Sequence, residues 1–212
     1  MISQDELKTT ENLKYKYKML MLGSEGVGKI PLAREYSALR LEGDYIKAFG
    51  VDFEKYNVNL PELKIGLTIW NLSCEQKFEK IREVYSKGAA VCLLVYDITR
   101  KSSLYDVFTG RIVKGLECKR LLDKSILVGN KHDLGDQRKV TPEEGIEFAK
   151  RIGCRGYVEV SDKTGYNVKE LLNFASFLPV YKQVPTVENY QILGKFAKKI
   201  KGEKYLRLKS KG

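Results

Sequence analysis

Residues Gly23-Ser24-Glu25-Gly26-Val27-Gly28-Lys29 fit the pattern GxxxxGK. They follow an apolar, partly alternating segment, Tyr15–Leu22, that is typical of a strand, and Pro31 is tolerated in the first turn of a helix. Backbone N–H groups of such a turn close around phosphate oxygens, and the helix N-terminus and Lys29 add positive charge. The strand–loop–helix context predicts a phosphate-binding loop. The alternative is an ordinary glycine-rich turn with a chance lysine.

The eighth position of this loop has no side-chain oxygen. A loop of this kind needs serine or threonine there, because the hydroxyl is a ligand of Mg²⁺, and this sequence has Ile30. The sequence therefore predicts a loop that binds phosphate but lacks one of the side chains that would hold Mg²⁺. The candidate phosphate-binding residues are Glu25, Gly26, Val27, Gly28, Lys29 and Ile30.

Segments with strand character alternate with segments of helical period along the chain. Strands are expected at Tyr15–Leu22, Val51–Leu60, Lys64–Trp70, Ala89–Asp97, Ser125–Gly129 and Tyr157–Val160. Helices are expected from Pro31 to Leu39, at Leu104–Leu122, from Thr141 to Arg151 and at Val168–Leu178. This alternation predicts a doubly wound α/β sheet. We expect one domain at residues 14–180, a flexible N-terminal tail at 1–13 and a basic C-terminal tail at 181–212.

Composition narrows the classes of function. The 212 residues carry a net charge of +11, which favours nucleotide phosphates, nucleic acid or an anionic membrane face as partners. The longest apolar run, Ala89–Tyr96, is too short to span a bilayer. The single histidine, His132, and four cysteines without CxxC spacing argue against Ser-His or Cys-His hydrolases and zinc sites.

Asn130-Lys131-His132-Asp133 follows a late expected strand and is a candidate base-binding loop. Asp133 can accept hydrogen bonds from N1–H and the amine of guanine, which adenine does not offer, and a site of this kind rejects the wrong base. The stem of Lys131 can pack along the base, and Asn130 can tie this loop to the phosphate loop. His132 is expected to be a surface side chain. Farther along, Ser161-Asp162-Lys163 can present a backbone N–H to guanine O6; the alternative is two ordinary polar loops.

With these motifs in place, the chain resembles the Ras-superfamily small GTPases, and within them the Rab branch, over residues 15–180. The resemblance is carried by Phe49-Gly50-Val51-Asp52-Phe53, Ile69-Trp70, Lys87-Gly88-Ala89, Leu94-Val95-Tyr96-Asp97-Ile98-Thr99, Val128 to Leu134 and Ser161-Asp162-Lys163-Thr164-Gly165. It implies a P-loop small G-domain with a six-stranded, mostly parallel sheet flanked by helices on both faces. It also implies bound GDP or GTP, and switch loops near residues 42–52 and 71–88 that contact effector or regulator proteins in trafficking or signalling.

The sequence departs from the family where the family does its chemistry. The metal-ligating or metal-supporting positions hold Ile30, Ala48 and Asn71, the glycine near the γ-phosphate is replaced by Cys74, and the water-positioning glutamine falls on Glu75. We therefore assign no catalytic and no metal-ligating residue, and we expect little or no GTP hydrolysis. Mg²⁺ is not an expected cofactor, and GDP is favoured over GTP because Glu25 and Glu75 repel a γ-phosphate.

Two alternatives to this interpretation remain open. In the first, the chain is a slow but active GTPase switch whose metal ligands are drawn from Asp44, Asp52, Glu75 and Gln76. In the second, the protein uses its charge to bind a membrane surface or nucleic acid. Nucleic acid is not an expected partner, because the positive charge is spread along the chain without interleaved aromatic residues.

The C-terminal residues have a basic amphipathic pattern. Apolar Ile192, Leu193, Phe196 and Ile200 recur at helical spacing among lysines. This pattern predicts either a helix on an anionic membrane or a solvated basic tail. The sequence ends in Lys209-Ser210-Lys211-Gly212, and its last cysteine, Cys154, lies inside the domain, so no prenyl anchor is expected. We expect a cytoplasmic protein, with peripheral membrane contact through the tail as an option.

Overall fold

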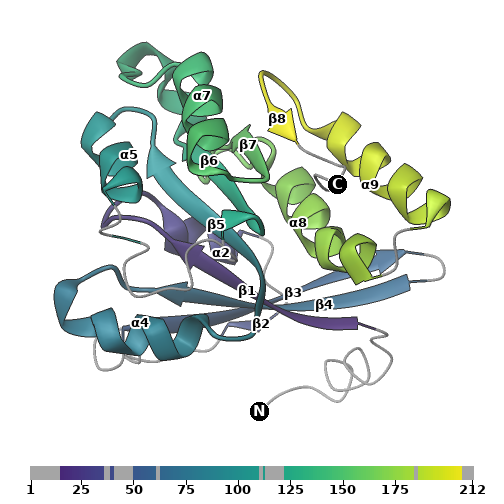
Figure 1. Ribbon diagram of the computed structural model, residues 1–212. Helices are drawn as coiled ribbons and strands as arrows, with labels where there is room; N and C mark the ends of the chain where they lie inside the picture. The colour runs from purple at the N-terminus through teal and green to yellow at the C-terminus, as the bar shows by residue number, and fades with distance from the viewer. Residues whose placement is uncertain are drawn as a thin grey trace.

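The computed structural model describes residues 15–35, 39–40, 50–60, 63–109, 112, 122–183 and 186–206. These residues form a mixed eight-stranded sheet with the order β2-β3-β4-β1-β5-β6-β7-β8 (Figure 1). The strands are β1 (Tyr15–Leu22), β2 (Leu39–Arg40), β3 (Val51–Leu60), β4 (Leu63–Leu72), β5 (Ala89–Asp97), β6 (Ser125–Asn130), β7 (Gly156–Glu159) and β8 (Tyr205–Leu206). The pairings β4–β1, β1–β5, β5–β6 and β6–β7 are parallel, and β2–β3, β3–β4 and β7–β8 are antiparallel.

The expected α/β fold class is confirmed, but the expected count of six strands is too low. The six expected strands are all present, and one two-residue strand is added at each edge of the sheet. Leu39 was expected to continue a helix and instead pairs with Lys55 of β3. Strands this short have no alternating pattern that a sequence can display, so both were missed.

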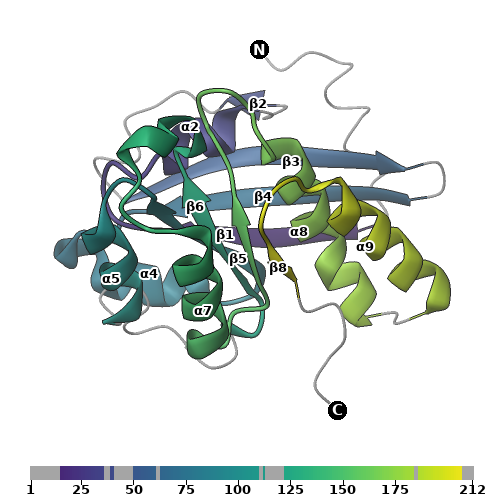
Figure 2. The same ribbon diagram turned by 90° about the horizontal axis from the view of Figure 1, so that it is seen from above.

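Helices cover both faces of the sheet (Figure 2). One buried cluster joins the sheet to α2, α8 and α9, and a second joins the opposite face to α5 and α7. The helices are α2 (Lys29–Arg34), α4 (Glu79–Ser86), α5 (Lys101–Phe108), α7 (Pro142–Ile152), α8 (Val168–Gln183) and α9 (Val187–Lys199), with 3₁₀ turns η1 (Gln76–Phe78) and η2 (His132–Gln137). Much of the expected helix Leu104–Leu122 lies outside the described residues, as do the expected N-terminal tail, Asp44 and Ala48.

The central strand β5 is buried almost throughout, as its continuous apolar run predicts. It lies between β1 and β6, and all three run in the same direction. Their carboxyl ends therefore lie at one edge of the sheet, where ligands bind in open α/β folds. The loops that follow β1, β5 and β6 are brought together at this edge.

The C-terminal residues differ from the expected tail. Helix α8 continues through the buried Pro179 to Gln183, and α9 packs against it with Leu193, Phe196 and Ile200 buried. The rings of Phe177 and Phe196 lie 5.8 Å apart. The domain thus extends past residue 180, and the apolar face of α9 is turned toward α8.

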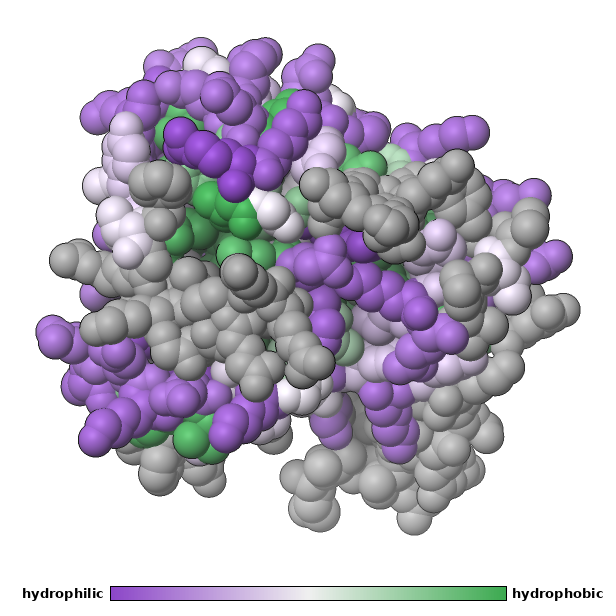
Figure 3. All heavy atoms as spheres, in the orientation of Figure 1, coloured by the Kyte–Doolittle hydropathy of each residue, from purple (hydrophilic) through white to green (hydrophobic). Residues whose placement is uncertain are grey.

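The polar face of α9 remains exposed, with Lys195, Lys198 and Lys199 outward. Hydrophilic side chains dominate the face of the molecule in Figure 3, and hydrophobic ones are visible only in patches between them. Within the described ranges, none of the helices combines the length and the apolar character needed to cross a membrane.

Candidate functional site

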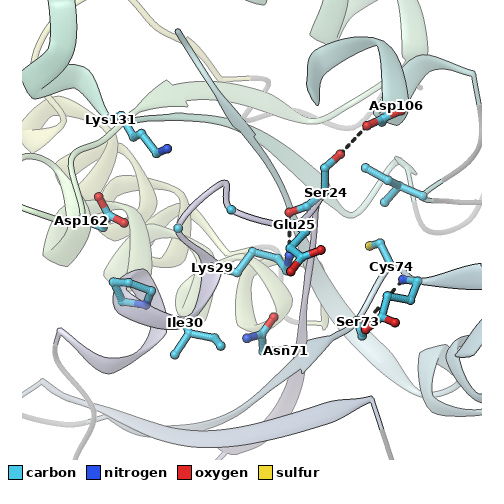
Figure 4. A pocket seen from close by; sticks show the side chains of 15 residues that line it. Ser24, Glu25, Lys29, Ile30, Asn71, Ser73, Cys74, Asp106, Lys131 and Asp162 are labelled. Carbon is cyan, nitrogen blue, oxygen red and sulfur yellow. Dashed lines mark hydrogen bonds between the residues drawn. The ribbon is translucent and has the colours of Figure 1, made fainter. Parts of the chain in front are cut away.

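A cavity of about 670 Å³ opens at the carboxyl edge of the sheet, beside the glycine-rich loop. Figure 4 shows its lining side chains converging from the loop after β1, the segment after β4, helix α5 and the loops after β6 and β7. The lining residues are Ser24, Glu25, Gly26, Gly28, Lys29, Ile30, Pro31, Asn71, Ser73, Cys74, Glu75, Asp106, Ile112, Lys131 and Asp162. The cavity therefore combines the two motifs that the sequence singled out.

The glycine-rich loop adopts a conformation that requires its glycines. Gly26 and Gly28 have φ angles of 73° and 91°, in the left-handed region. A Cβ atom at Gly28 would also overlap the side chains of Asn130 and Asp162. Val27 between them is fully buried. The loop thus packs directly on the base-binding loops, and α2 begins at the next residue, Lys29.

The Lys29 ammonium closes the loop. Nζ donates hydrogen bonds to the carbonyl oxygens of Gly23 at 2.6 Å and Ser24 at 2.9 Å. Burial lowers the pKa of Lys29, and the nearby Cys74 and Glu25 side chains oppose that shift. The positive charge of Lys29 therefore lies at the end of the cavity that the glycine-rich loop forms.

The base-binding loop is tied to the phosphate loop through the fully buried Asn130. Asn130 Nδ2 donates to the carbonyl oxygen of Val27 at 2.8 Å, and Oδ1 accepts from the N–H of Asp162 at 3.1 Å. This contact is the one the sequence predicted for Asn130. It joins three loops that are far apart in the chain.

Lys131 lies in the left-handed region, with a φ of 69°, and its Nζ is 2.6 Å from Asp97 Oδ2. Burial would raise the pKa of Asp97, but hydrogen bonds from Lys131 and Thr99 outweigh it and hold the pKa below its usual range. The pair fixes the Lys131 side chain at the wall of the cavity.

Asp133 is exposed, and its Oδ1 accepts a hydrogen bond of 2.6 Å from the Ser161 hydroxyl. The same hydroxyl accepts from the N–H of Thr164 at 3.1 Å. The second base loop therefore holds the Asp133 carboxylate in place. Asp162 lines the cavity, whereas Lys163 is exposed and is not among the lining residues.

His132 is at the surface, as expected, and makes two contacts there. Its ring stacks on Tyr166 with centroids 4.2 Å apart, and Nε2 lies 4.0 Å from Glu159 Oε2. The side chain is 40% exposed. It supports the base loop from outside and does not line the cavity.

Mg²⁺ needs several oxygen ligands in near-octahedral geometry. Ile30 lines the cavity with an apolar side chain, and the buried Asn71 contributes an amide and no carboxylate. Asp52, a possible substitute, is 3.3 Å from Arg34 and is not a lining residue. Ala48 and Asp44 are outside the described residues. The described side chains at this end of the cavity do not match a magnesium site.

Glu75, another possible substitute, is held by neighbours of its own segment. Its carboxylate lies 2.8 Å from Lys77 Nζ and accepts a 3.3 Å hydrogen bond from the Ser73 hydroxyl. In the ranges that the structure describes, no group of three His, Cys, Asp or Glu side chains could hold a metal ion.

The segment after β4 is anchored by Arg82, which is 2% exposed. Its guanidinium donates to the carbonyl oxygens of Ser73 at 2.9 Å and Glu75 at 2.8 Å. The N–H of Ser73 donates to Gly50 at 2.7 Å. Cys74 is thereby held at the cavity wall, half-buried.

Two contacts at the rim of the phosphate loop escaped the sequence analysis. The Ser24 hydroxyl donates to Asp106 Oδ2 at 2.6 Å, and an Arg100 terminal nitrogen donates to the carbonyl oxygen of Glu25 at 2.6 Å. Arg100 and Asp106 belong to the N-terminal boundary and the body of α5. Neither stands in a motif, so no sequence signal marks them.

Comparison with protein families gives an independent assignment. The family model described as Ras family matches residues 18–178, which is well over half of the chain. The matched region contains the glycine-rich loop, both candidate base loops and all of the parallel strands except the first three residues of β1. The chain therefore belongs to the Ras family.

Proposed function

We propose that this protein is a guanine-nucleotide-binding module of the Rab branch that binds its nucleotide without Mg²⁺ and hydrolyses GTP little or not at all. Ras-family proteins are GTP-binding small GTPases, and the match to this family covers residues 18–178, which include the candidate phosphate and base loops. The supporting observation is that Asn130 joins these loops while Ile30 lines the phosphate end of the same cavity.

The residues of the cavity fit a guanine nucleotide. The glycine loop and the α2 N-terminus offer amide N–H groups to phosphates, and Lys29 adds a full charge. Asp133, held by Ser161, is positioned to accept the N1–H and amine protons of guanine. The Lys131 stem offers an apolar surface for one face of the base. In this proposal Lys29, Lys131, Asp133 and Ser161 each help to bind the nucleotide, and Asn130 holds the two loops together.

The phosphate end is poorly suited to a triphosphate. Glu25 and Glu75 line it as carboxylates, and Cys74 places a side chain where the family has glycine. Without a divalent cation, the γ-phosphate charge would face these carboxylates at close range. We therefore expect GDP to bind more tightly than GTP.

Small GTPases act through effector and regulator proteins, and the segment at residues 71–88 is our candidate contact surface. Beside it, Phe53 and Trp70 pack edge to face at 4.6 Å, and Trp70 and Tyr85 at 5.4 Å. All three side chains are partly exposed, and the neighbouring Val84 is 60% exposed. Aromatic side chains of this kind are enriched in protein interfaces, which favours a role in trafficking or signalling through protein contacts.

Contact with an anionic membrane would have to rest on charge. The apolar face of α9 is buried in the core, so it is not available to insert into a bilayer. The outward lysines would each contribute about 1 kcal/mol of binding free energy when they lie close to an anionic membrane surface. We propose a weak, salt-sensitive contact that supplements the protein contacts.

The most informative experiment is to denature the purified protein and identify any released nucleotide by chromatography. Calorimetric titration with GDP, GTP and ATP in EDTA then measures base and phosphate preference. GDP should bind most tightly and ATP should not compete. Asp133→Ala should weaken guanine nucleotides several-fold because it leaves the base donors unpaired, with the exposed Asp136→Ala as control. Equal affinity for ATP and GTP would refute guanine recognition.

A further inference from the structure

A cation that lies outside the motifs of the sequence analysis is packed against the phosphate loop. Arg100 is the N-cap residue of α5, and one terminal nitrogen of its guanidinium donates a hydrogen bond to the Glu25 carbonyl oxygen at 2.6 Å. Both terminal nitrogens lie within 4 Å of the point where a Cβ on Gly26 would stand, at 3.7 and 3.9 Å. The charge is therefore packed against the turn at Glu25–Gly26.

The bonded carbonyl has a direct chemical link to the phosphate-facing side of the loop. The C=O of Glu25 and the N–H of Gly26 are the two ends of one planar peptide group. A charged donor on the oxygen polarises that group and strengthens its N–H as a donor, because hydrogen bonds in series reinforce one another. Gly26 lines the cavity.

The charge balance of the cavity gives this contact its importance. Four carboxylates, Glu25, Glu75, Asp106 and Asp162, and two ammonium groups, Lys29 and Lys131, line the cavity. Glu75 is paired with Lys77 and Lys131 with Asp97, and besides these two pairs the lining holds three carboxylates and one ammonium group. Where Mg²⁺ would neutralise phosphate, the described side chains offer no matching ligand set. A further cation beside the loop is the chain's own means of offsetting this excess of negative charge.

We propose that Arg100 is a phosphate-affinity determinant, whose guanidinium holds and polarises the Glu25–Gly26 peptide and partly replaces the positive charge of a metal ion. This inference rests on the proposed function, because it needs a phosphorylated ligand in the cavity. Arg100 acts through the loop and is a positioning residue. Burial is the main cause that lowers the pKa of Lys29, and the Arg100 charge adds to that lowering, which agrees with both charges acting on one region.

The test compares GDP with guanosine, which shares the base and lacks phosphate. Both are titrated in EDTA against the wild type and the variants Arg100→Ala, Arg100→Gln and Arg100→Lys. Arg100→Ala and Arg100→Gln should weaken GDP about 3- to 10-fold and leave guanosine unchanged, and Arg100→Lys should keep most of the GDP affinity. The loss should shrink as salt rises from about 50 mM to about 500 mM, because the group is exposed.

Lys101→Ala is the matched control. Lys101 is the next residue, has the same charge and is exposed, but its Nζ contacts Glu144 at 2.8 Å, away from the loop. It should leave GDP affinity unchanged. The inference is overturned if Arg100→Ala binds GDP like the wild type, or if guanosine weakens as much as GDP, which would mean a purely structural role. Failure of the wild type itself to bind GDP would refute the proposed function and this inference with it.

Discussion

Asn130 and Val27 are 103 positions apart in the chain, yet Asn130 Nδ2 donates a 2.8 Å hydrogen bond to the Val27 carbonyl oxygen. Both residues are fully buried, so water cannot replace this bond. The other side of the same amide accepts the N–H of Asp162 at 3.1 Å. One side chain thereby sets the position of the phosphate loop relative to both base loops.

Asn130→Ala should therefore lower both stability and nucleotide affinity. The substitution leaves a buried carbonyl without its donor, and we expect unfolding free energy to fall by about 1–3 kcal/mol. GDP affinity should fall about tenfold or more, because the loops lose their relative position. Chemical denaturation and calorimetry measure the two effects. Asp136→Ala, at an exposed position outside the cavity lining, is the control; equal losses in both variants would argue against a specific role for Asn130.

The Lys131–Asp97 pair should make stability depend on pH. The pKa of Asp97 is held below its usual value, so its contribution is complete above about pH 4, the unfolded value, and is lost as pH falls through the folded value. Asp97→Asn should lose about 1–2 kcal/mol at pH 7. The difference in unfolding free energy between Asp97→Asn and the wild type should become smaller below about pH 4. Urea denaturation across this range checks the sign, and a gap that widens on acidification would contradict it.

Helix α9 should behave as part of the domain. Phe196 is 7% exposed and packs against Phe177, so Phe196→Ala should lower unfolding free energy by about 3 kcal/mol. The exposed neighbour Lys195→Ala should change stability by less than about 0.5 kcal/mol. Thermal unfolding of both variants gives the comparison. If Phe196→Ala melts like the wild type, α9 does not contribute to the core.

Chelation of divalent cations should hardly change nucleotide release. Ile30, Asn71 and the Arg34-paired Asp52 provide no magnesium site in the described residues, so we expect bound GDP to depend on Lys29 and the loop amides. Release of a fluorescent GDP analogue is followed by stopped flow with Mg²⁺ and with EDTA. A large acceleration in EDTA would reveal a bound metal after all.

The regular elements of this fold were accessible from sequence because their patterns are strong. Strands β1, β3 and β5 were predicted with their observed ends, since each is a long apolar or alternating run bounded by turns. The Thr141 capping box was also visible in the sequence, and the structure has both of its hydrogen bonds. These strands and this helix cap depend on interactions between residues that are close in the chain, so they can be predicted from a single sequence.

The features that the sequence missed depend on tertiary contacts. The helix continues past Pro179 because its neighbours bury it on the sheet, which overrides the local signal. Likewise, α9 buries the apolar stripe that was assigned to a membrane or to solvent, and nothing in that stripe names its partner. Arg100 and Arg82 donate hydrogen bonds to backbone carbonyls of other loops. Such contacts produce no characteristic residue spacing, so the sequence alone does not reveal them. The site motifs, by contrast, were visible because each is local.

A single substitution that introduces one of the family's catalytic or metal-ligating residues should not produce GTP hydrolysis. Phosphoryl transfer in this family needs metal coordination and a positioned water together, so the contributions are non-additive. On the function proposed above, Glu75→Gln supplies only the water-positioning group, and Ile30→Ser supplies only one metal ligand. Each variant should remain at the wild-type rate under single-turnover conditions. Recovery of Mg²⁺-dependent turnover by either change alone would show that the remaining machinery is intact.

The central claim is tested most directly by single-turnover GTP hydrolysis of the wild-type protein, measured with Mg²⁺ and with EDTA against an ordinary small GTPase. The account predicts turnover that is far below that of the reference or indistinguishable from buffer, with no difference between the two conditions. A Mg²⁺-dependent rate comparable with that of the reference would contradict it, and would mean that the chain assembles a metal site from residues other than Ile30 and Asn71.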